Sequence, residues 1–176
     1  MYVAEATRWR DDNKDGDYVD VDREDPSTAF LVPPASVDMA DLSVIYGLGK
    51  GGFSAVMLVQ RKTDSEFFAL KVISKSMMRE PKHRKRLQVE RVILQKLEPS
   101  PFIARLTNAF QTDSELFFLM DYCAGGDLCY QCFRIFSKID RFNDGQARFY
   151  VTQITLAIEH LHKHGYVHRD IKVREK

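Results

Sequence analysis

The sequence predicts an α+β fold in which a five-stranded antiparallel sheet and one main helix are followed by further helices. Two observations carry this prediction. Between residues 42 and 123, five strand-like segments alternate with turn residues, and only the segment 82–97 has the apolar spacing of an amphipathic helix. After the small residues of 124–128, the apolar spacing is helical again. We therefore expect a sheet-rich part and a helical part joined by a hinge.

The composition is typical of a globular domain, and an acidic tail precedes it. Of the 176 residues, 44% are hydrophobic and 29% are charged. The net charge is +1, yet residues 1–25 hold nine acids and four bases, a net charge of −5. We interpret residues 1–40 as a mostly disordered tail, in which the apolar stretch 29–34 is either a docking segment or a linker.

No segment indicates a membrane span or a secretory signal. A span needs about 18 consecutive apolar residues, and the sequence has no such run. We expect a cytoplasmic protein by default, with the nucleus as the alternative, and no nucleic-acid partner.

The three cysteines, Cys123, Cys129 and Cys132, lie close together, and the last two form a C-x-x-C pair. A zinc site would need a fourth ligand at suitable spacing, which the sequence lacks. We therefore favour free thiols in a reducing compartment over a zinc or redox site, and we predict no metal ligands.

The first three strands, 42–49, 53–62 and 66–74, surround a glycine-rich turn. Four glycines fall within six residues of this turn: Gly47, Gly49, Gly51 and Gly52. Glycine lets a ligand approach the main chain closely, and backbone N–H groups at such a turn bind anions. The stretch alone leaves two interpretations open, a nucleotide phosphate site or a glycine-rich hairpin beside a strand.

The third strand carries one cation in an apolar run. Alternation along 66–74 puts Phe67, Ala69, Lys71 and Ile73 on the same face. A lysine among apolar neighbours needs an anionic partner, because burial of an unpaired charge costs stability. In the first interpretation of the turn, that partner includes a phosphate.

The helix predicted at 82–97 carries a carboxylate within its apolar face, which is formed by Leu87, Glu90, Ile93, Leu94 and Leu97. Glu90 pairs either with a basic residue of its own helix or with Lys71. The second interpretation gives both charges a partner.

Two further strands, 102–112 and 115–123, form an antiparallel hairpin around the turn 112–114. A small-residue hinge at 124–128 then leads into a short amphipathic helix at about 127–136.

A long helix follows, with Asn143 and Gln146 as its N-terminal capping box and Gly165 as its C-terminal stop. Its apolar face is predicted to contain Ala147, Tyr150, Val151, Ile154, Ala157, Ile158 and Leu161. Directly after it, the segment 166–172 crowds His168, Arg169, Asp170 and Lys172 behind a short apolar stretch.

Taken together, these motifs resemble the eukaryotic protein kinases over residues 42–172. The order and the separations agree: Glu90 follows Lys71 by 19 positions, and Asp170 follows Glu90 by 80 positions. The resemblance implies a kinase-like small lobe at 41–123, including the hinge, and an incomplete large lobe at 124–176.

The resemblance also implies site roles for particular residues. Lys71 would contact the ATP phosphates with Glu90 as its ion-pair partner, Asp170 would orient and deprotonate the substrate hydroxyl, and Lys172 would complete the catalytic group. The remaining nucleotide-binding positions are the glycine-rich loop, Ala69, the gatekeeper and hinge, and an acid near the ribose: Gly49, Lys50, Gly51, Gly52, Phe53, Ser54, Val56, Ala69, Met120, Asp121, Cys123 and Asp127. Ser54 replaces the third glycine of the family's G-x-G-x-x-G pattern.

The lysine at position 172, two residues after Asp170, resembles the pattern of the serine/threonine kinases. The segments 101–103 and 124–128 resemble the corresponding segments of the AGC group. That group implies a protein substrate with basic residues near the phosphoacceptor and a docking groove for a hydrophobic segment beside helix 82–97. Bases gather at the start of this helix: Lys82, Arg84, Lys85 and Arg86. Arg86 is either a phosphate contact or a solvated charge.

The chain departs from the family pattern near its end. The family places a magnesium-binding asparagine five residues after the catalytic aspartate, where this sequence has Glu175, and no Asp-Phe-Gly follows before Lys176. We therefore expect a kinase that uses ATP and Mg²⁺ by family, with weak or no activity in this truncated chain. The alternative is a non-catalytic, pseudokinase-like fragment that binds partners or nucleotide.

Overall fold

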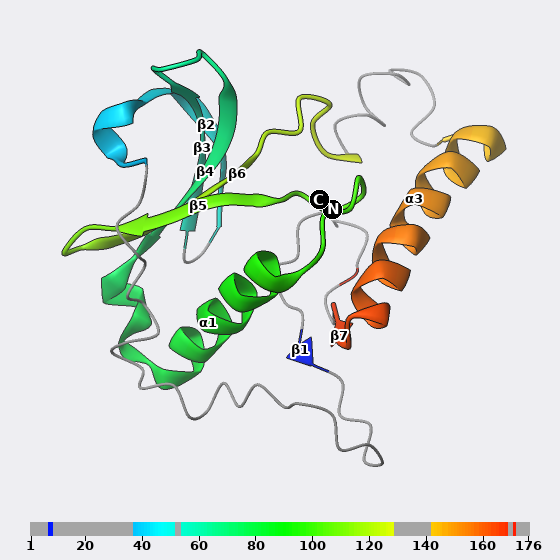
Figure 1. Ribbon diagram of the computed structural model, residues 1–176. Coiled ribbons are helices and arrows are strands. Elements are labelled where there is room, and N and C mark those ends of the chain that lie inside the picture. The colour runs from blue at the N-terminus through cyan, green and yellow to red at the C-terminus, as the bar shows by residue number, and fades with distance from the viewer. Residues whose placement is uncertain (1–6, 9–36, 52–53, 129–141, 169–170, 172–176) are drawn as a thin grey trace.

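The computed structural model describes residues 7–8, 37–51, 54–128, 142–168 and 171. At its centre is a five-stranded antiparallel sheet with the strand order β2-β3-β4-β6-β5 (Figure 1). The strands are β2 (Leu42–Lys50), β3 (Ser54–Arg61), β4 (Phe67–Ser74), β5 (Leu106–Gln111) and β6 (Glu115–Asp121). The sheet, with the helices described next, confirms the predicted fold class.

Helix α1 (Pro81–Lys96) packs on one face of this sheet (Figure 1). It starts with proline at its first turn, where the missing N–H has no helical partner to lose. Ile93 and Leu94 of α1 are buried in the same cluster as Phe118 and Met120 of β6. This cluster is the larger part of the hydrophobic core, and a 3-10 segment, η2 (Lys75–Arg79), connects β4 to α1.

The opposite face of the sheet has its own core. Phe117 and Leu119 alternate with the α1-facing residues of β6 and are buried there with Phe68. The short 3-10 turn η1 (Met39–Asp41) leads into β2, and Val37, just before it, is also buried in this cluster. A capping box between Asp38 and Asp41 holds the turn.

Helix α3 (Asp144–Lys163) lies beside the sheet and α1, on the right of Figure 1. Its N-terminus has the predicted capping box, in which Asn143 Oδ1 accepts the N–H of Gln146 and Gln146 Oε1 accepts the N–H of Asn143. The helix ends at Lys163, and Gly165, the predicted C-terminal stop, follows with a positive φ of 75°, the left-handed conformation that favours glycine.

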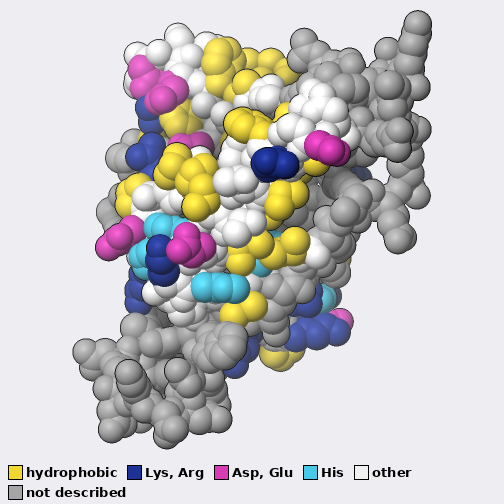
Figure 2. Space-filling view, turned by 90° about the vertical axis from the view of Figure 1, so that its right-hand side faces the viewer, with side chains coloured by type: hydrophobic (Ala, Val, Ile, Leu, Met, Phe, Trp, Pro, Cys, Tyr) yellow, Lys and Arg dark blue, Asp and Glu magenta, His cyan; other side chains and the backbone are white. Residues whose placement is uncertain are grey.

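The predicted apolar face of α3 is only partly buried. Ala157 and Leu161 join the core that α1 forms with the sheet, whereas Val151 is 61% exposed. The reason is that only the C-terminal half of α3 packs on the core described above. Figure 2, which views this side of the molecule, shows hydrophobic side chains on its surface, and those exposed on α3 are Phe149, Val151 and Leu156.

A second, two-stranded sheet has no counterpart in the sequence prediction. Strand β1 (Thr7–Arg8) pairs antiparallel with β7 (Tyr166–Val167), so a short piece of the acidic tail lies beside the strand that follows α3. The register places Thr7 opposite Val167 and Arg8 opposite Tyr166.

Other boundaries differ modestly from the prediction. Strand β5 starts at Leu106, not at residue 102, because residues 101–103 form a turn in which the Ile103 N–H donates to the Ser100 carbonyl. The short helix expected at 127–136 and the apolar stretch 29–34 lie outside the described residues, the helix except for its first two positions. In the part of the chain that the structure describes, no helix is both long and apolar enough to cross a membrane.

Candidate functional site

Five of the predicted site residues of the sheet fall into two neighbouring rows. Gly49 of β2 pairs with Val56 of β3, and Val56 pairs with Lys71 of β4. In the next row, Ala69 of β4 pairs with Met120 of β6. Directly paired residues present their side chains on one face, and so do residues two apart along a strand. Val56, Lys71, Ala69 and Met120 therefore share the face of the sheet on which α1 packs.

Lys71 and Glu90 form a buried ion pair across the gap between β4 and α1. Lys71 Nζ lies 2.8 Å from Glu90 Oε1 and 3.0 Å from Oε2, and the two side chains are 10% and 5% exposed. Of the two interpretations of Glu90, the structure shows the pairing with Lys71. The carboxylate holds the ammonium at a defined place on the sheet row that also contains Gly49 and Val56.

The glycines of the turn leave space beside the main chain. A Cβ atom at Gly49 would meet no atom within 4 Å, and one at Gly51 would make only an ordinary contact, 3.6 Å from the Ser54 carbonyl oxygen. Their φ angles are outside the left-handed region, so close approach, and not unusual backbone angles, is the property that glycine supplies here. The Gly51 N–H donates to the Ser54 carbonyl at 2.8 Å, which closes the turn.

The hinge starts at Asp121, the last residue of β6, and has one hydrogen bond to Arg105 at its start and one within its own turn. The Asp121 N–H donates to the Arg105 carbonyl at 3.1 Å, and the Gly126 N–H donates to the Cys123 carbonyl at 3.3 Å. Gly126 has a φ of 74°, which explains why a glycine stands in this turn.

A tyrosine pair joins the hinge to the strand that enters the glycine-rich turn. A hydrogen bond between the side chains of Tyr122 and Tyr46 raises the pKa of Tyr122 above its usual value of 10.0. Sequence reasoning missed this pair, because nothing along the chain indicates that the two residues meet.

The remaining predicted residues are divided between described and undescribed parts of the chain. Lys50 and Asp127 are exposed, at the end of β2 and after the hinge turn. His168 is buried directly after β7, two positions before the predicted catalytic residue Asp170. The others, Gly52, Phe53, Asp170, Lys172 and Glu175, lie outside the described residues.

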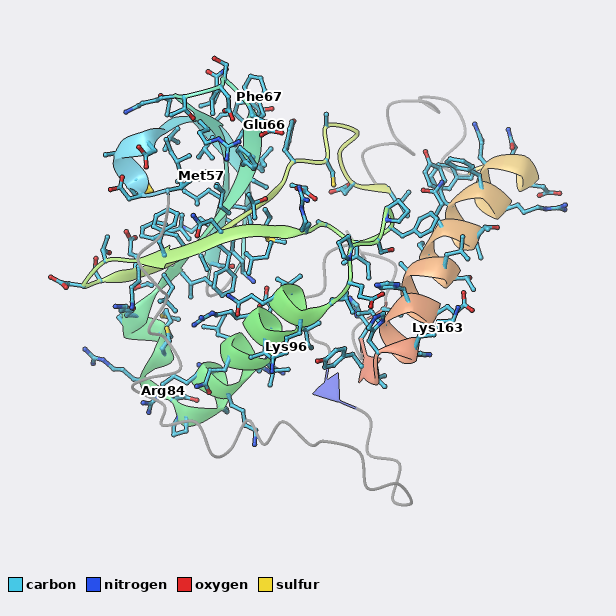
Figure 3. All side chains as sticks on the ribbon, in the orientation of Figure 1. Met57, Glu66, Phe67, Arg84, Lys96 and Lys163 are labelled. Atoms are coloured by element: carbon cyan, nitrogen blue, oxygen red, sulfur yellow. The ribbon has the colours of Figure 1, made fainter. Side chains whose placement is uncertain are left out.

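The basic start of α1 is at the surface. Lys82, Lys85 and Arg86 are exposed, and Figure 3 shows Arg84 near the first turns of α1 and Lys96 at its other end. Lys82 pairs with Glu80 at 2.8 Å, an exposed contact of the kind that contributes little to stability. The role of Arg86 as a phosphate contact stays a prediction.

Among the described residues, no group of three or more His, Cys, Asp or Glu side chains is placed to hold a metal ion. Cys123 is an exposed free thiol, and Cys129 and Cys132 lie outside the described residues.

Comparison with known proteins places this geometry in a family. The protein kinase domain model matches residues 42–174. This chain belongs to the protein kinase family. The match includes both halves of the Lys71–Glu90 pair, the glycine-rich turn and the hinge.

Curated relatives agree with the assignment: all three described next are named as protein kinases, and two of them as serine/threonine-protein kinases. The chain is 38% identical over 136 residues to the RAC family serine/threonine-protein kinase homolog of Dictyostelium discoideum, covering 77% of this chain and 30% of that protein. It is 34% identical over 132 residues to the human serine/threonine-protein kinase Sgk2, covering 75% of this chain and 35% of that protein. It is also 34% identical over 146 residues to protein kinase C-like 1B of Caenorhabditis elegans, covering 83% of this chain and 20% of that protein.

These relatives support an AGC-like serine/threonine kinase, as the sequence predicted. The aligned region spans a fifth to about a third of the length of each relative. The part compared is therefore one portion of a longer enzyme in each of them.

Proposed function

We propose that this chain contributes the nucleotide site of an ATP-dependent serine/threonine protein kinase, which transfers the γ-phosphoryl group of ATP to a protein hydroxyl. The observation that carries the proposal is the buried ion pair of Lys71 and Glu90, in the sheet row that also holds Gly49 and Val56. A positioned ammonium beneath backbone that a phosphate can approach closely is what phosphate recognition requires.

Each part of the site has a proposed task. The 49–56 turn covers the phosphates, and Lys71 neutralises part of their charge while Glu90 keeps its ammonium in place. Val56 and Ala69 are partly exposed on the same face of the sheet and present apolar surface that suits the faces of a purine ring, while Met120, paired with Ala69, is buried in the core beside them. The hinge at 121–123 offers backbone groups to the edge of the base, and Asp127 lies close behind the hinge for the ribose or the peptide.

The proposed catalytic group is Asp170, three residues after β7, with Lys172 two residues further on. Asp170 would orient the substrate hydroxyl and accept its proton while the γ-phosphoryl group is transferred. Magnesium accompanies ATP in this family, and among the described residues no group of three or more His, Cys, Asp or Glu side chains is placed to hold it. We propose a substrate with basic residues near the phosphoacceptor, as the AGC resemblance implies.

The experiment is a phosphotransfer assay with the purified chain, Mg-ATP and a basic serine-containing peptide. The proposal predicts weak phosphate incorporation that Asp170→Ala and Lys71→Met abolish. Lys96→Met, an exposed lysine at the end of α1, is the matched control and should retain the wild-type rate. Equal incorporation in all variants would refute the assignment.

A second candidate, nucleotide binding without transfer, is favoured by one observation, the glutamate at position 175. ATP binding that Lys71→Met weakens, with no incorporation into the peptide by wild type, would support this candidate over the first.

A further inference from the structure

Asp121, the last residue of β6, is tied to Arg105 by three contacts. The Asp121 N–H donates to the Arg105 carbonyl at 3.1 Å, and the Arg105 N–H donates to Asp121 Oδ2 at 3.1 Å. The third contact joins the Arg105 guanidinium to Asp121 Oδ1 at 3.6 Å. The backbone of Arg105 thus donates one hydrogen bond to residue 121 and accepts another from it.

This clasp continues the β5–β6 ladder to the start of the hinge. The last pair of the ladder joins Leu106 and Met120, after a register shift between Leu106 and Asn108. The bulge brings Arg105 opposite Asp121, where a regular ladder would have placed Leu106. The Asp121 carboxylate therefore accepts the Arg105 N–H, as a backbone carbonyl would within the ladder. This hydrogen bond holds residue 121 in line with β6.

The contacts of the clasp differ in strength. The guanidinium and the carboxylate of the long contact are 63% and 41% exposed, and ion pairs of that kind contribute little. The hydrogen bond from a backbone N–H to a carboxylate is charge-assisted and is the stronger of the two side-chain contacts.

We propose that Asp121 is a positioning residue for the nucleotide base: its carboxylate, through the Arg105 N–H, fixes the hinge backbone that reads the edge of the purine. The inference rests on the proposed function. An adenine presents an N–H donor at the position where guanine presents a carbonyl oxygen, so a hinge held in one register distinguishes the two bases. A hinge released from Arg105 must be ordered when the nucleotide binds, and it discriminates less between the bases.

The test is equilibrium binding of fluorescent ATP and GTP analogues to the chain and its variants. In Asp121→Ala, the dissociation constant for the ATP analogue should rise by about five- to tenfold, the size of one lost hydrogen bond, and the preference for ATP over GTP should fall. Asp121→Asn keeps an oxygen that accepts the Arg105 N–H, so it should restore most of the affinity for the ATP analogue and most of the preference for ATP over GTP. Arg105→Ala removes only the exposed contact and should resemble wild type.

The matched control is Asp113→Ala, which removes an exposed aspartate at the opposite end of the same hairpin. It should leave both affinities unchanged. The ratio of the two affinities matters most, because a general loss of folded protein lowers the apparent binding of both nucleotides equally and leaves the ratio as it was.

Three results would overturn the inference: an unchanged ratio in Asp121→Ala, an Arg105→Ala variant as impaired as Asp121→Ala, or an Asp121→Asn variant without rescue. If Asp121→Ala does not fold, amide exchange in the wild-type chain decides. The Arg105 N–H should then exchange more slowly with the ATP analogue bound than with the GTP analogue bound, and equal slowing would refute the inference. A wild-type chain that binds neither nucleotide would instead refute the proposed function, and this inference with it.

Discussion

Breaking the buried ion pair of Lys71 and Glu90 should destabilise the protein far more than removing the pair altogether. Lys71→Met leaves the Glu90 carboxylate, 5% exposed, without its cation. Loss of one partner from a buried pair costs about 3–5 kcal/mol, whereas replacing both partners by apolar side chains is often nearly neutral. A domain of this kind has a free energy of unfolding of about 5–15 kcal/mol, so the single variant loses a large share of it.

The measurement is urea unfolding of wild type, Lys71→Met, Glu90→Leu and the double variant, followed by circular dichroism. Lys163→Met is the matched control, because Lys163 and Glu159 are also 2.8 Å apart but are 66% and 51% exposed (Figure 3). Its unfolding midpoint should stay close to wild type. The reasoning would be refuted if the single variants cost less than about 1 kcal/mol, or if their costs simply added in the double variant.

Three further predictions concern the turn between β3 and β4 and the start of α3. Arg61 hydrogen-bonds Asp64 and lowers the pKa of that carboxyl below 3.8, so the stability that Asp64 contributes is present above pH 3.8 and is lost as the pH falls through the lower, folded-state pKa. In unfolding experiments, the difference between wild type and Asp64→Asn should accordingly shrink below pH 3.8, and a constant difference would contradict this. Ser65→Gly should raise the free energy of unfolding by about 0.5 kcal/mol, because Ser65 has a φ of 62° and relief of that strain exceeds the added entropy of the unfolded glycine. A lower free energy of unfolding for this variant, measured by thermal unfolding, would count against the prediction. Asn143→Ala should cost about 1 kcal/mol in the same assay through the lost cap of α3, and no change would show that the cap is unimportant.

Much of the fold follows from local patterns that the sequence displays. Alternation along β4 placed Lys71 on the same face as Ala69 and Ile73, and the structure shows that α1 packs on this face. The spacing of α1 correctly put Glu90 among its buried residues. The pairing of these two residues was predictable because each charge needed a partner in an apolar setting. The turn signals at 112–114 likewise predicted the β5–β6 hairpin.

The rest depends on contacts that local patterns do not encode. The bulge near Leu106 shifts the register by one residue, and only this shift makes Arg105 the partner of Asp121. Apolar residues spaced three or four apart along α3 indicated a buried face, yet burial also requires a neighbouring element. Val151 is exposed because, among the described residues, the core covers only the other end of the helix. The pairing of Thr7–Arg8 with β7 joins the two ends of the chain, and no local signal predicts so distant a contact.

The position of the ATP phosphates is tested most directly by an ATP acyl-phosphate, which transfers its acyl group to a lysine beside the bound phosphates. Digestion and mass spectrometry then identify the modified residue. The proposed site predicts modification of Lys71 that excess ATP prevents. Modification confined to exposed lysines such as Lys62 or Lys96, or modification of Lys71 that ATP does not prevent, would contradict it.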